Sequence, residues 1–263
     1  MQLSVVVITF NEEANIGRTL ESVQSLVSGG KGEIIVVDSG STDRTVEIAK
    51  SFGAQVFIEE WKGYAAQKNS AIDKASGEWI LSLDADESLE SGLADAIRPL
   101  TSRPHGEVAL AGYRLPRKNF FLGRWIRHGG FWPDPKLRLF RRGSGRFESR
   151  LVHEDVQING QTGRIMSGAL IHNSYPTLSD YIDHMNRYSS LGAEMLVAKG
   201  KVGFSFLNIV ARPFFTFIYN YFFRLGFLDG RAGLLLHLYH AVYVSWKYAK
   251  AWELSRQKRT MSS

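Results

Sequence analysis

Over the first ninety residues, short apolar runs alternate with segments in which apolar residues recur every three or four positions. The runs are rich in valine and isoleucine, as buried strands usually are, and they predict strands at 3–9, 33–38, 55–58 and 79–83. Helices are expected in between: one carrying Ile16, Leu20, Val23 and Val27, one ending at Ala49, and one at 64–75. This alternation predicts an α/β fold, doubly wound around a mostly parallel sheet with helices on both faces.

Beyond residue 100 the regular alternation stops. We expect a helix at 89–100, strands at 109–118, 136–142 and 170–175, a further strand near Val156 and Ile158, and a helix at 179–199. The pattern therefore predicts a first domain at 1–198, made of the halves 1–100 and 101–198, and a separate helical region at 199–263.

The C-terminal region is both aromatic and basic. Residues 202–223 are strongly apolar, but Arg212 and Pro213 interrupt them near the middle, and a second apolar stretch follows at 232–243. A charge at the centre of a membrane-spanning helix is costly, so the pattern favours helices that lie in the membrane interface. A spanning segment and a soluble or dimer-forming bundle are the alternatives.

Charge and composition sharpen this view. From Lys199 onward there are ten Lys or Arg and two Asp or Glu residues, so the whole excess of the +6 net charge lies in this quarter, which predicts attraction to an anionic membrane surface. No nucleic-acid-binding motif occurs, and the absence of cysteine excludes disulfides and thiolate metal sites. Neither a G-x-G-x-x-G nor a Walker A sequence is present. The first ten residues are expected to form a strand and not a signal peptide.

Candidate chemistry gathers where predicted strands end. Asp84 and Asp86 follow the strand at 79–83, and carboxylates two residues apart on an extended segment project to the same side. Such a pair suits Mg²⁺ or Mn²⁺ carrying a substrate phosphate, although aspartate is also common in plain turns. Asp38 ends the second strand and can accept hydrogen bonds from a base or ribose. Asn11 can cap the first helix, and Ser41 or Thr42 can cap the second.

Four blocks together resemble the family-two inverting glycosyltransferases of the GT-A fold. They are Val6-Val7-Ile8-Thr9-Phe10-Asn11-Glu12-Glu13, Asp38-Ser39-Gly40-Ser41-Thr42-Asp43, Gln67-Lys68-Asn69 and Asp84-Ala85-Asp86-Glu87. The resemblance implies a nucleotide-sugar donor and a divalent cation, Mg²⁺ or Mn²⁺. It implies donor binding by Thr9, Asn11, Glu12, Asp38, Lys68 and Asp84, and metal binding by Asp86. The two halves of the first domain would then bind the nucleotide and the acceptor.

Later residues complete the expected site. An inverting transferase needs a general base on the acceptor side, for which the adjacent acids Glu154 and Asp155 are candidates, Glu154 being preferred. The alternative is that one of them only pairs with an arginine. GT-A enzymes often use a late histidine as a further metal ligand, which His172 would be unless it is structural. The basic, aromatic segment 117–130 is expected to form an acceptor loop or, alternatively, a surface loop with buried aromatic residues.

Blocks at 151–154, 171–175 and 223–230 are similar to those of the bacterial lipopolysaccharide inner-core β-1,4-glucosyltransferases. This resemblance implies UDP-glucose as donor, a lipid-linked heptose as acceptor, and a peripheral or monotopic enzyme on the cytoplasmic face of the inner membrane. Two alternatives remain open: transfer to a polyprenyl phosphate, and a non-catalytic sugar-nucleotide-binding membrane protein.

Overall fold

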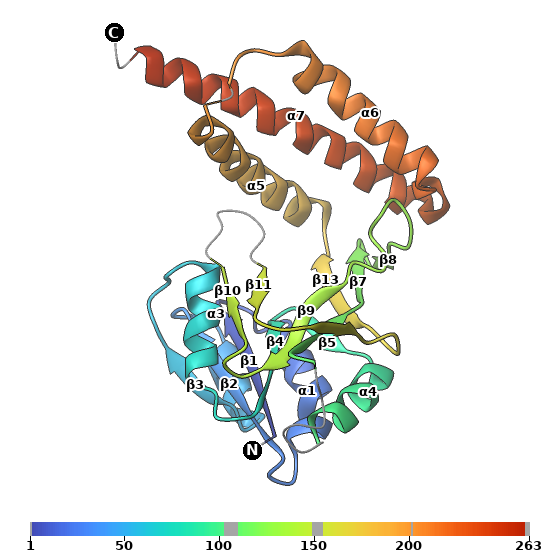
Figure 1. Ribbon diagram of the computed structural model, residues 1–263. Coiled ribbons are helices and arrows are strands. Elements are labelled where there is room, and N and C mark those ends of the chain that lie inside the picture. Colours follow the sequence, from blue (N-terminus) through green and yellow to red (C-terminus); the bar gives the residue numbers. More distant parts are fainter. Residues whose placement is uncertain (1, 103–109, 149–154, 201, 261–263) are drawn as a thin grey trace. The chain divides into compact units, whose positions relative to one another are not determined.

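The computed structural model describes residues 2–102, 110–148, 155–200 and 202–260. These residues form two compact units (Figure 1). The first unit contains residues 2–102, 110–118, 134–148 and 155–172, and the second contains 119–133, 173–200 and 202–260. The chain therefore passes from the first unit to the second and back before it enters the C-terminal helices.

The predicted strands and helices of the first ninety residues are confirmed, with small shifts at their ends. The strands are β1 (Leu3–Thr9), β2 (Gly32–Asp38), β3 (Gln55–Ile58) and β4 (Trp79–Asp84). The helices are α1 (Ile16–Val27), α2 (Thr45–Ser51) and α3 (Tyr64–Asp73), followed by the short strand β5 (Glu87–Leu89) and α4 (Ser91–Thr101). Pairing of β4, β1, β2 and β3 is parallel throughout, as the alternation predicts.

The other half of the seven-stranded sheet is mixed. The strand order is β12-β6-β9-β4-β1-β2-β3, with β6 at Gly112–Leu115, β9 at Lys136–Arg141 and β12 at Thr162–Arg164. Strand β9 lies antiparallel to both β4 and β6, so the doubly wound parallel pattern stops at β4. The physical reason is that the described residues 116–135, which connect β6 to β9, contain no crossover helix, and parallel neighbours need such a crossover.

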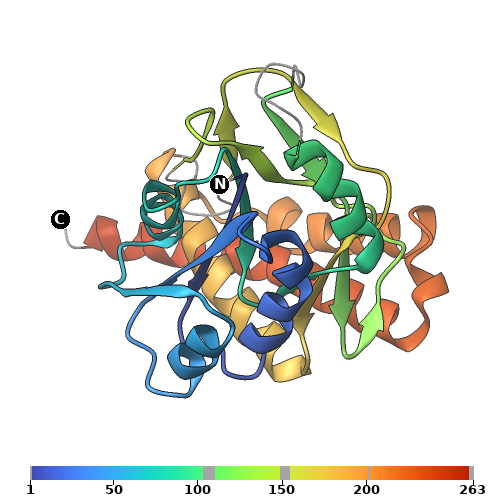
Figure 2. The ribbon, with the colours of Figure 1, turned by 90° about the horizontal axis from the view of Figure 1, so that it is seen from below.

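Helices cover both faces of this sheet (Figures 1 and 2), and an apolar core lies on each face. Alternate residues of β1 point to opposite faces, so Val5 and Val7 pack with α1 and α4, while Val6 and Ile8 pack with α3. On the α3 face, β10 (Gly145–Phe147) pairs with β11 (Val156–Ile158) and adds Phe147 and Val156 to the core. A sheet buried on both faces explains why its central strands read as continuous apolar runs.

A smaller four-stranded sheet has the order β5-β13-β7-β8. Its remaining strands are β7 (Arg117–Phe121), β8 (Arg124–Trp125) and β13 (Leu170–Tyr175). Within the first unit, β13 pairs antiparallel with β5 and sets His172 opposite Glu87. The residues that follow Asp86 are therefore held next to the strand that carries His172.

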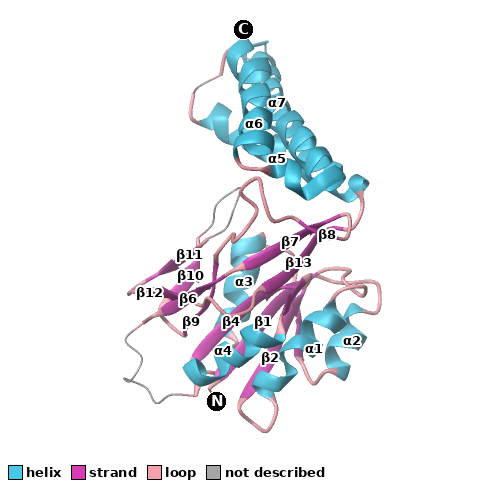
Figure 3. Cartoon of the chain, turned by 90° about the vertical axis from the view of Figure 1, so that its right-hand side faces the viewer, coloured by secondary structure: helices cyan, strands magenta, loops and turns pink. Residues whose placement is uncertain are grey.

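The second unit is mainly helical (Figure 3). It contains α5 (Leu178–Ala198), α6 (Arg212–Ile218) and α7 (Gly230–Thr260), with π-helical turns at Leu207–Ala211 and Tyr219–Phe223 and a 3₁₀ turn at Gly226–Asp229. Arg212 and Pro213 open α6 and do not break the helical path, because a proline in the first turn needs no N–H partner. Helices α5 and α7 are joined by Lys250, whose ammonium group donates to Asn186, Ser189 and Ser190 of α5.

None of the helices in the described part of the chain is long and apolar enough to span a membrane.

Candidate active site

Three of the predicted site residues lie side by side at one edge of the main sheet. The strand register sets Thr9 of β1 opposite Asp38 of β2, and Ile8 of β1 opposite Asp84 of β4. All three strands are parallel, so the loops that follow them emerge at the same edge. The carboxyl ends of open α/β sheets are where such folds bind ligands, and the predicted residues of the first four blocks cluster there.

The loops after β1 and β2 are fastened to each other. The side chain of Asn11 accepts a hydrogen bond from the Thr42 N–H at 2.9 Å, and the Asn11 N–H donates to the Ser41 hydroxyl at 2.8 Å. The Glu12 N–H donates to the Thr45 hydroxyl at 2.8 Å. These bonds join residues about thirty positions apart and fix the two loops as one surface.

Two predicted helix caps are wrong. Asn11 lies before the start of α1 with a φ of 53°, and the N-cap position of α1 is Asn15. Helix α2 begins at Thr45, where Asp43, and neither Ser41 nor Thr42, accepts the Thr45 N–H at 3.0 Å. In both cases the expected capping side chain bonds to the neighbouring loop, so a long-range contact replaces the local one.

Asp38 shapes the turn that follows β2. Its fully buried carboxylate accepts hydrogen bonds from the backbone N–H groups of Gly40 and Ser41, at 2.9 and 2.7 Å, and from the Ser41 hydroxyl. The buried hydroxyls of Thr9 and Ser39 have no hydrogen-bond partner within the described ranges. Buried polar groups are normally paired, so these two hydroxyls at the sheet edge are open to a ligand.

Asp84 is held between two positive charges. Its carboxylate lies 2.6 Å from the Lys68 ammonium and 2.5 Å from the Arg138 guanidinium. Burial alone would raise the pKa of Asp84, but the charges of Arg138 and Lys68 outweigh it and keep the pKa well below its usual value. Asp84 is therefore an ionised anchor whose charge is already balanced by the protein.

Beneath Asp84 lies an ion network that the sequence reasoning missed. The fully buried Glu87 accepts from Arg138 at 2.8 Å, from Arg117 at 3.0 Å and from the Asp84 N–H at 3.1 Å. Arg117 also pairs with Asp134 at 2.8 Å. A signal was available, since an arginine inside an apolar strand such as 136–141 requires an acidic partner. The sequence does not reveal which acid that is.

We expect Glu87→Gln to destabilise the first unit by about 3 kcal/mol, because it leaves two buried guanidinium groups short of a counter-charge. Urea unfolding of the two proteins would measure this loss. The matched control is Glu47→Gln, which removes an exposed partner of Arg44 and should change stability by less than about 0.5 kcal/mol. Equal midpoints for the wild-type chain and Glu87→Gln would contradict the role of the network.

Asp86 and His172 form the second feature of the site. The His172 Nε2 lies 3.2 Å from an Asp86 carboxylate oxygen, and both side chains are partly exposed. Burial would raise the pKa of Asp86, but the contact with His172 more than offsets it and lowers the pKa. The pKa of the nearby Glu12 is raised, by burial first and then by the negative charges of Asp86, Asp43 and Asp84. A positive charge placed among these acids would be stabilised by all of them.

This donor set fits a divalent cation whose remaining ligands come from a substrate. A carboxylate oxygen and an imidazole nitrogen are both suitable for Mn²⁺. No group of three or more acidic or histidine side chains able to hold a metal occurs in the part of the chain that the structure describes. Metal ions of this kind usually keep water and phosphate ligands in addition to one or two carboxylates. Asp86 and His172 could therefore supply all of the protein ligands that such an ion needs.

The structure describes one of the two candidate bases. Glu154 lies outside the described residues. Asp155 is exposed just before β11, and its side chain accepts a hydrogen bond from the next N–H, that of Val156, at 3.0 Å. The structure thus brings Thr9, Glu12, Asp38, Lys68, Asp84, Asp86 and His172 to one region, and the choice of base stays a prediction.

Comparison with known proteins decides the family. The model of glycosyl transferase family 2 matches residues 4–167, which include every residue of the cluster described above except His172. The chain belongs to glycosyl transferase family 2. The mixed central sheet with helices on both faces is the GT-A fold of this family. As a family 2 member, the chain is a glycosyltransferase.

Relatives of this family 2 glycosyltransferase extend over nearly its full length. It is 31% identical over 259 residues to the lipopolysaccharide core biosynthesis glycosyltransferase LpsC of Rhizobium meliloti, covering 96% of this chain and 93% of that protein. It is also 31% identical over 269 residues to an uncharacterized glycosyltransferase of Rickettsia typhi, covering 99% of this chain and 90% of the relative. The resemblance to lipopolysaccharide core enzymes is thus supported by a relative of that description.

Two solved structures share the fold. The mannosyltransferase PcManGT of Pyrobaculum calidifontis, in complex with GDP-Man and Mn²⁺, has a TM-score of 0.58 and 17% identity, covering 95% of this chain and 86% of that one. TarS of S. aureus, in complex with UDP, has a TM-score of 0.51 and 18% identity, covering 98% and 92%. At these identities the likeness concerns the fold alone.

Proposed function

We propose that this glycosyltransferase moves a hexose, with inversion and with the help of Mg²⁺ or Mn²⁺, from a nucleotide donor to a lipid-linked saccharide. The donor we infer is UDP-glucose, and the acceptor is a heptose of the lipopolysaccharide inner core. The observation that carries the proposal is the Asp86–His172 pair beside Asp84, at the sheet edge where the buried hydroxyls of Thr9 and Ser39 have no hydrogen-bond partner among the described residues. The relative that acts in lipopolysaccharide core biosynthesis supports the acceptor class.

Each side chain of the cluster has a role that its contacts support. Asp38 and Asn11 hold the two loops that would receive the nucleotide, and the hydroxyls of Thr9 and Ser39 would bond to it. Lys68 and Arg138 keep Asp84 ionised and fixed in place, so that its carboxylate can accept a hydrogen bond from a ribose hydroxyl. Asp86 and His172 would hold the cation, with Glu12 adding negative charge nearby.

The reaction is a displacement at the anomeric carbon. Glu154, or in its place Asp155, would take the proton from the acceptor hydroxyl as its oxygen attacks, and the nucleoside diphosphate would leave from the opposite face. A cation bound at Asp86 and His172 supplies charge neutralisation for the departing diphosphate. Holding donor and acceptor in register on fixed loops contributes much of the rate.

The direct test is an assay of the full chain with several nucleotide sugars and with lipid-linked acceptors of different length. We expect glucose transfer from UDP-glucose to a heptose-containing acceptor, dependent on Mn²⁺ or Mg²⁺, with a β-configured product detected by NMR. A product with the α configuration would contradict inversion. Transfer of another sugar, or to another lipid-linked saccharide, would replace the donor or acceptor and leave the site intact.

The second unit supports work at a membrane surface. From 206 to 223, exposed apolar residues recur at helical spacing, and we call them the aromatic face: Phe206, Leu207, Val210, Phe214, Phe215, Tyr219, Phe222 and Phe223. Phe223 is 75% exposed. A large exposed apolar patch is unusual on a soluble protein and typically contacts a membrane or a partner. Arg212 and Arg224 on the same segment suit anionic headgroups.

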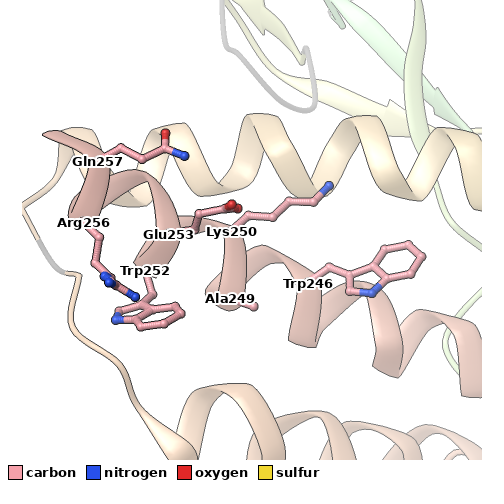
Figure 4. A pocket seen from close by; sticks show the side chains of 7 residues that line it. All are labelled: Trp246, Ala249, Lys250, Trp252, Glu253, Arg256 and Gln257. Carbon is pink, nitrogen blue, oxygen red and sulfur yellow. The ribbon is translucent and has the colours of Figure 1, made fainter.

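A second aromatic and basic area lies near the C-terminal end of α7. A pocket of about 740 Å³ lies there. Figure 4 shows side chains that line it, among them Trp246, Trp252 and Arg256. The Arg256 guanidinium lies 5.2 Å from the centre of the Trp252 ring, and Phe204 packs edge-on against the same ring. Tryptophan and arginine are common at the level of lipid headgroups. We propose that this unit holds the enzyme on the cytoplasmic face of the inner membrane.

Replacing Phe215 and Phe223 together by serine is expected to weaken binding to anionic phosphatidylglycerol vesicles at least about tenfold, because each buried phenylalanine contributes roughly 1.5–3 kcal/mol. Vesicle co-sedimentation measures this. The control is Ile58→Ser with Met166→Ser, which removes exposed apolar side chains of the first unit and should leave binding unchanged. Unaltered sedimentation of the double phenylalanine variant would show that the aromatic face stays out of the bilayer.

A further inference from the structure

A second pocket, which we call the arginine pocket, lies within the helical unit. Its volume is about 610 Å³, and its wall includes Leu122, Arg124, Trp125, Arg127, His128 and Asp229. Leu122 lies in the turn between β7 and β8, Arg124 and Trp125 form β8, and Arg127 and His128 follow it. Asp229 ends the 3₁₀ turn. Volumes of this size are usual for sites that bind small molecules.

Asp229 fixes the shape of the arginine pocket. Its carboxylate is almost fully buried and accepts hydrogen bonds from the N–H groups of Arg127 and His128, at 3.2 and 2.8 Å. The His128 Nδ1 lies 3.1 Å from the same carboxylate and donates to it. The segment after β8 is thereby pinned to a turn about a hundred residues later in the chain. Because three donors already engage this carboxylate, it opposes an incoming anion only weakly.

Two exposed arginines give the arginine pocket its charge. Neither Arg124 nor Arg127 forms an ion pair or a side-chain hydrogen bond with any of the residues that the structure describes. The Arg127 guanidinium lies 4.2 Å from the centre of the Trp125 ring, and this stacking orients it. Guanidinium groups bind phosphate and carboxylate through paired hydrogen bonds, so two of them beside one hollow suit an oxyanion.

The rest of the wall is apolar and indicates what carries the oxyanion. Leu122, Trp125 and the exposed Leu228 offer carbon surface next to the arginines. A free phosphate would use only the arginines, whereas a sugar can lay its C–H face on carbon while its charged substituent reaches the guanidinium groups. We propose that the arginine pocket binds a phosphate or carboxylate group carried by the acceptor saccharide. This inference rests on the proposed function and deepens it, since it makes the acceptor an acidic saccharide.

The first test measures binding by isothermal titration calorimetry on the full chain, with UDP and Mn²⁺ present in excess to occupy the donor site. The probes are glucose 6-phosphate, glucuronate, neutral methyl glucoside and inorganic phosphate, and phosphatidylglycerol vesicles in a separate experiment. We expect the two charged sugars to bind and methyl glucoside to bind at least tenfold more weakly. In Arg124→Gln/Arg127→Gln, the dissociation constants for both charged sugars should rise at least tenfold.

The control is Arg164→Gln/Arg187→Gln, which removes two exposed charges outside the arginine pocket and should alter these constants less than twofold. An unchanged dissociation constant for UDP and an unchanged circular dichroism spectrum show that the variants are folded. The proposal is overturned if the arginine variant binds the charged sugars like the wild-type chain, or if no charged sugar binds at all. It is also overturned if inorganic phosphate binds as tightly as glucose 6-phosphate, or if only vesicle binding depends on the two arginines.

The second test separates this proposal from the proposed function. With an acidic lipid-linked acceptor, Arg124→Gln/Arg127→Gln should raise the acceptor KM at least tenfold and leave kcat and the donor KM nearly unchanged. Transfer with an unaltered acceptor KM would sink the arginine pocket and leave the transferase intact. Arginine-dependent binding of charged sugars without any sugar transfer would sink the proposed function and leave the arginine pocket standing.

Discussion

Asp86→Ala should lower the rate of sugar transfer by at least about a thousandfold, because it removes the carboxylate that would hold the cation and with it several kcal/mol of charge stabilisation at the leaving diphosphate. His172→Ala should have a smaller effect, about tenfold to a hundredfold, since the imidazole would be the second of the two proposed protein ligands. Transfer rates at several Mn²⁺ concentrations measure both losses. Raising the Mn²⁺ concentration should recover part of the activity of His172→Ala and little of that of Asp86→Ala.

A matched control for Asp86 is Asp95→Ala on α4, where the exposed carboxylate pairs with Arg98 one helical turn away. This variant should transfer sugar at the wild-type rate. Electron paramagnetic resonance of Mn²⁺ in the presence of UDP gives an independent measure, because bound and free ions differ in their signal. Near-normal turnover of Asp86→Ala, or equal Mn²⁺ affinity of both variants, would contradict the metal role of Asp86.

Glu154→Gln should reduce transfer by about a hundredfold to ten-thousandfold, the usual contribution of a general base. Asp155→Asn should have a much smaller effect, because the Asp155 side chain is exposed and accepts a hydrogen bond from the adjacent backbone. Single-turnover transfer measured with saturating donor and acceptor isolates the chemical step. The affinity for UDP should be equal in the two variants and the wild-type chain, since both acids are proposed to act on the acceptor and not on the nucleotide.

The pair of variants distinguishes three outcomes. A large loss in Asp155→Asn alone would move the base by one residue. Losses in both would mean that the two acids act together or that the loop has changed. Full activity of Glu154→Gln would indicate an acceptor that needs no base, such as a polyprenyl phosphate, whose oxygen is already ionised.

Local patterns predicted the first half of the fold well. The strands at 3–9 and 79–83 were readable because buried parallel strands leave continuous apolar runs, and the strand order then brought Thr9, Asp38 and Asp84 to one edge. The antiparallel direction of β9 could not be predicted, because the sequence of a strand as short as Lys136–Arg141 does not indicate its direction in the sheet. Pairing partners depend on long-range packing, which periodicity does not encode.

The structure brings several predicted site residues together, through contacts that the sequence does not reveal. Asp86 and His172 could be named from sequence, and the structure sets them 3.2 Å apart although 86 positions separate them. The pairing of Asp84 with Arg138 could not be predicted, because no local pattern around residue 138 indicates which acid it contacts. Asn11 misled for a related reason, since its capping ability is real but is used on Thr42 of the neighbouring loop.

Residues 119–133 belong to the second unit although they lie in the middle of the chain, and this limits which truncated forms of the protein can fold. Phe121 and Ile126 of this segment pack in one apolar cluster with Tyr181 of α5 and Leu236 of α7. A truncation after residue 198 would remove Leu236 and uncover the two side chains, which lie in the middle of the retained chain. Expression of a chain that ends at residue 198 is therefore expected to give insoluble protein. To obtain the protein without detergent, polar substitutions on the aromatic face are preferable to deletion of the C-terminal helices.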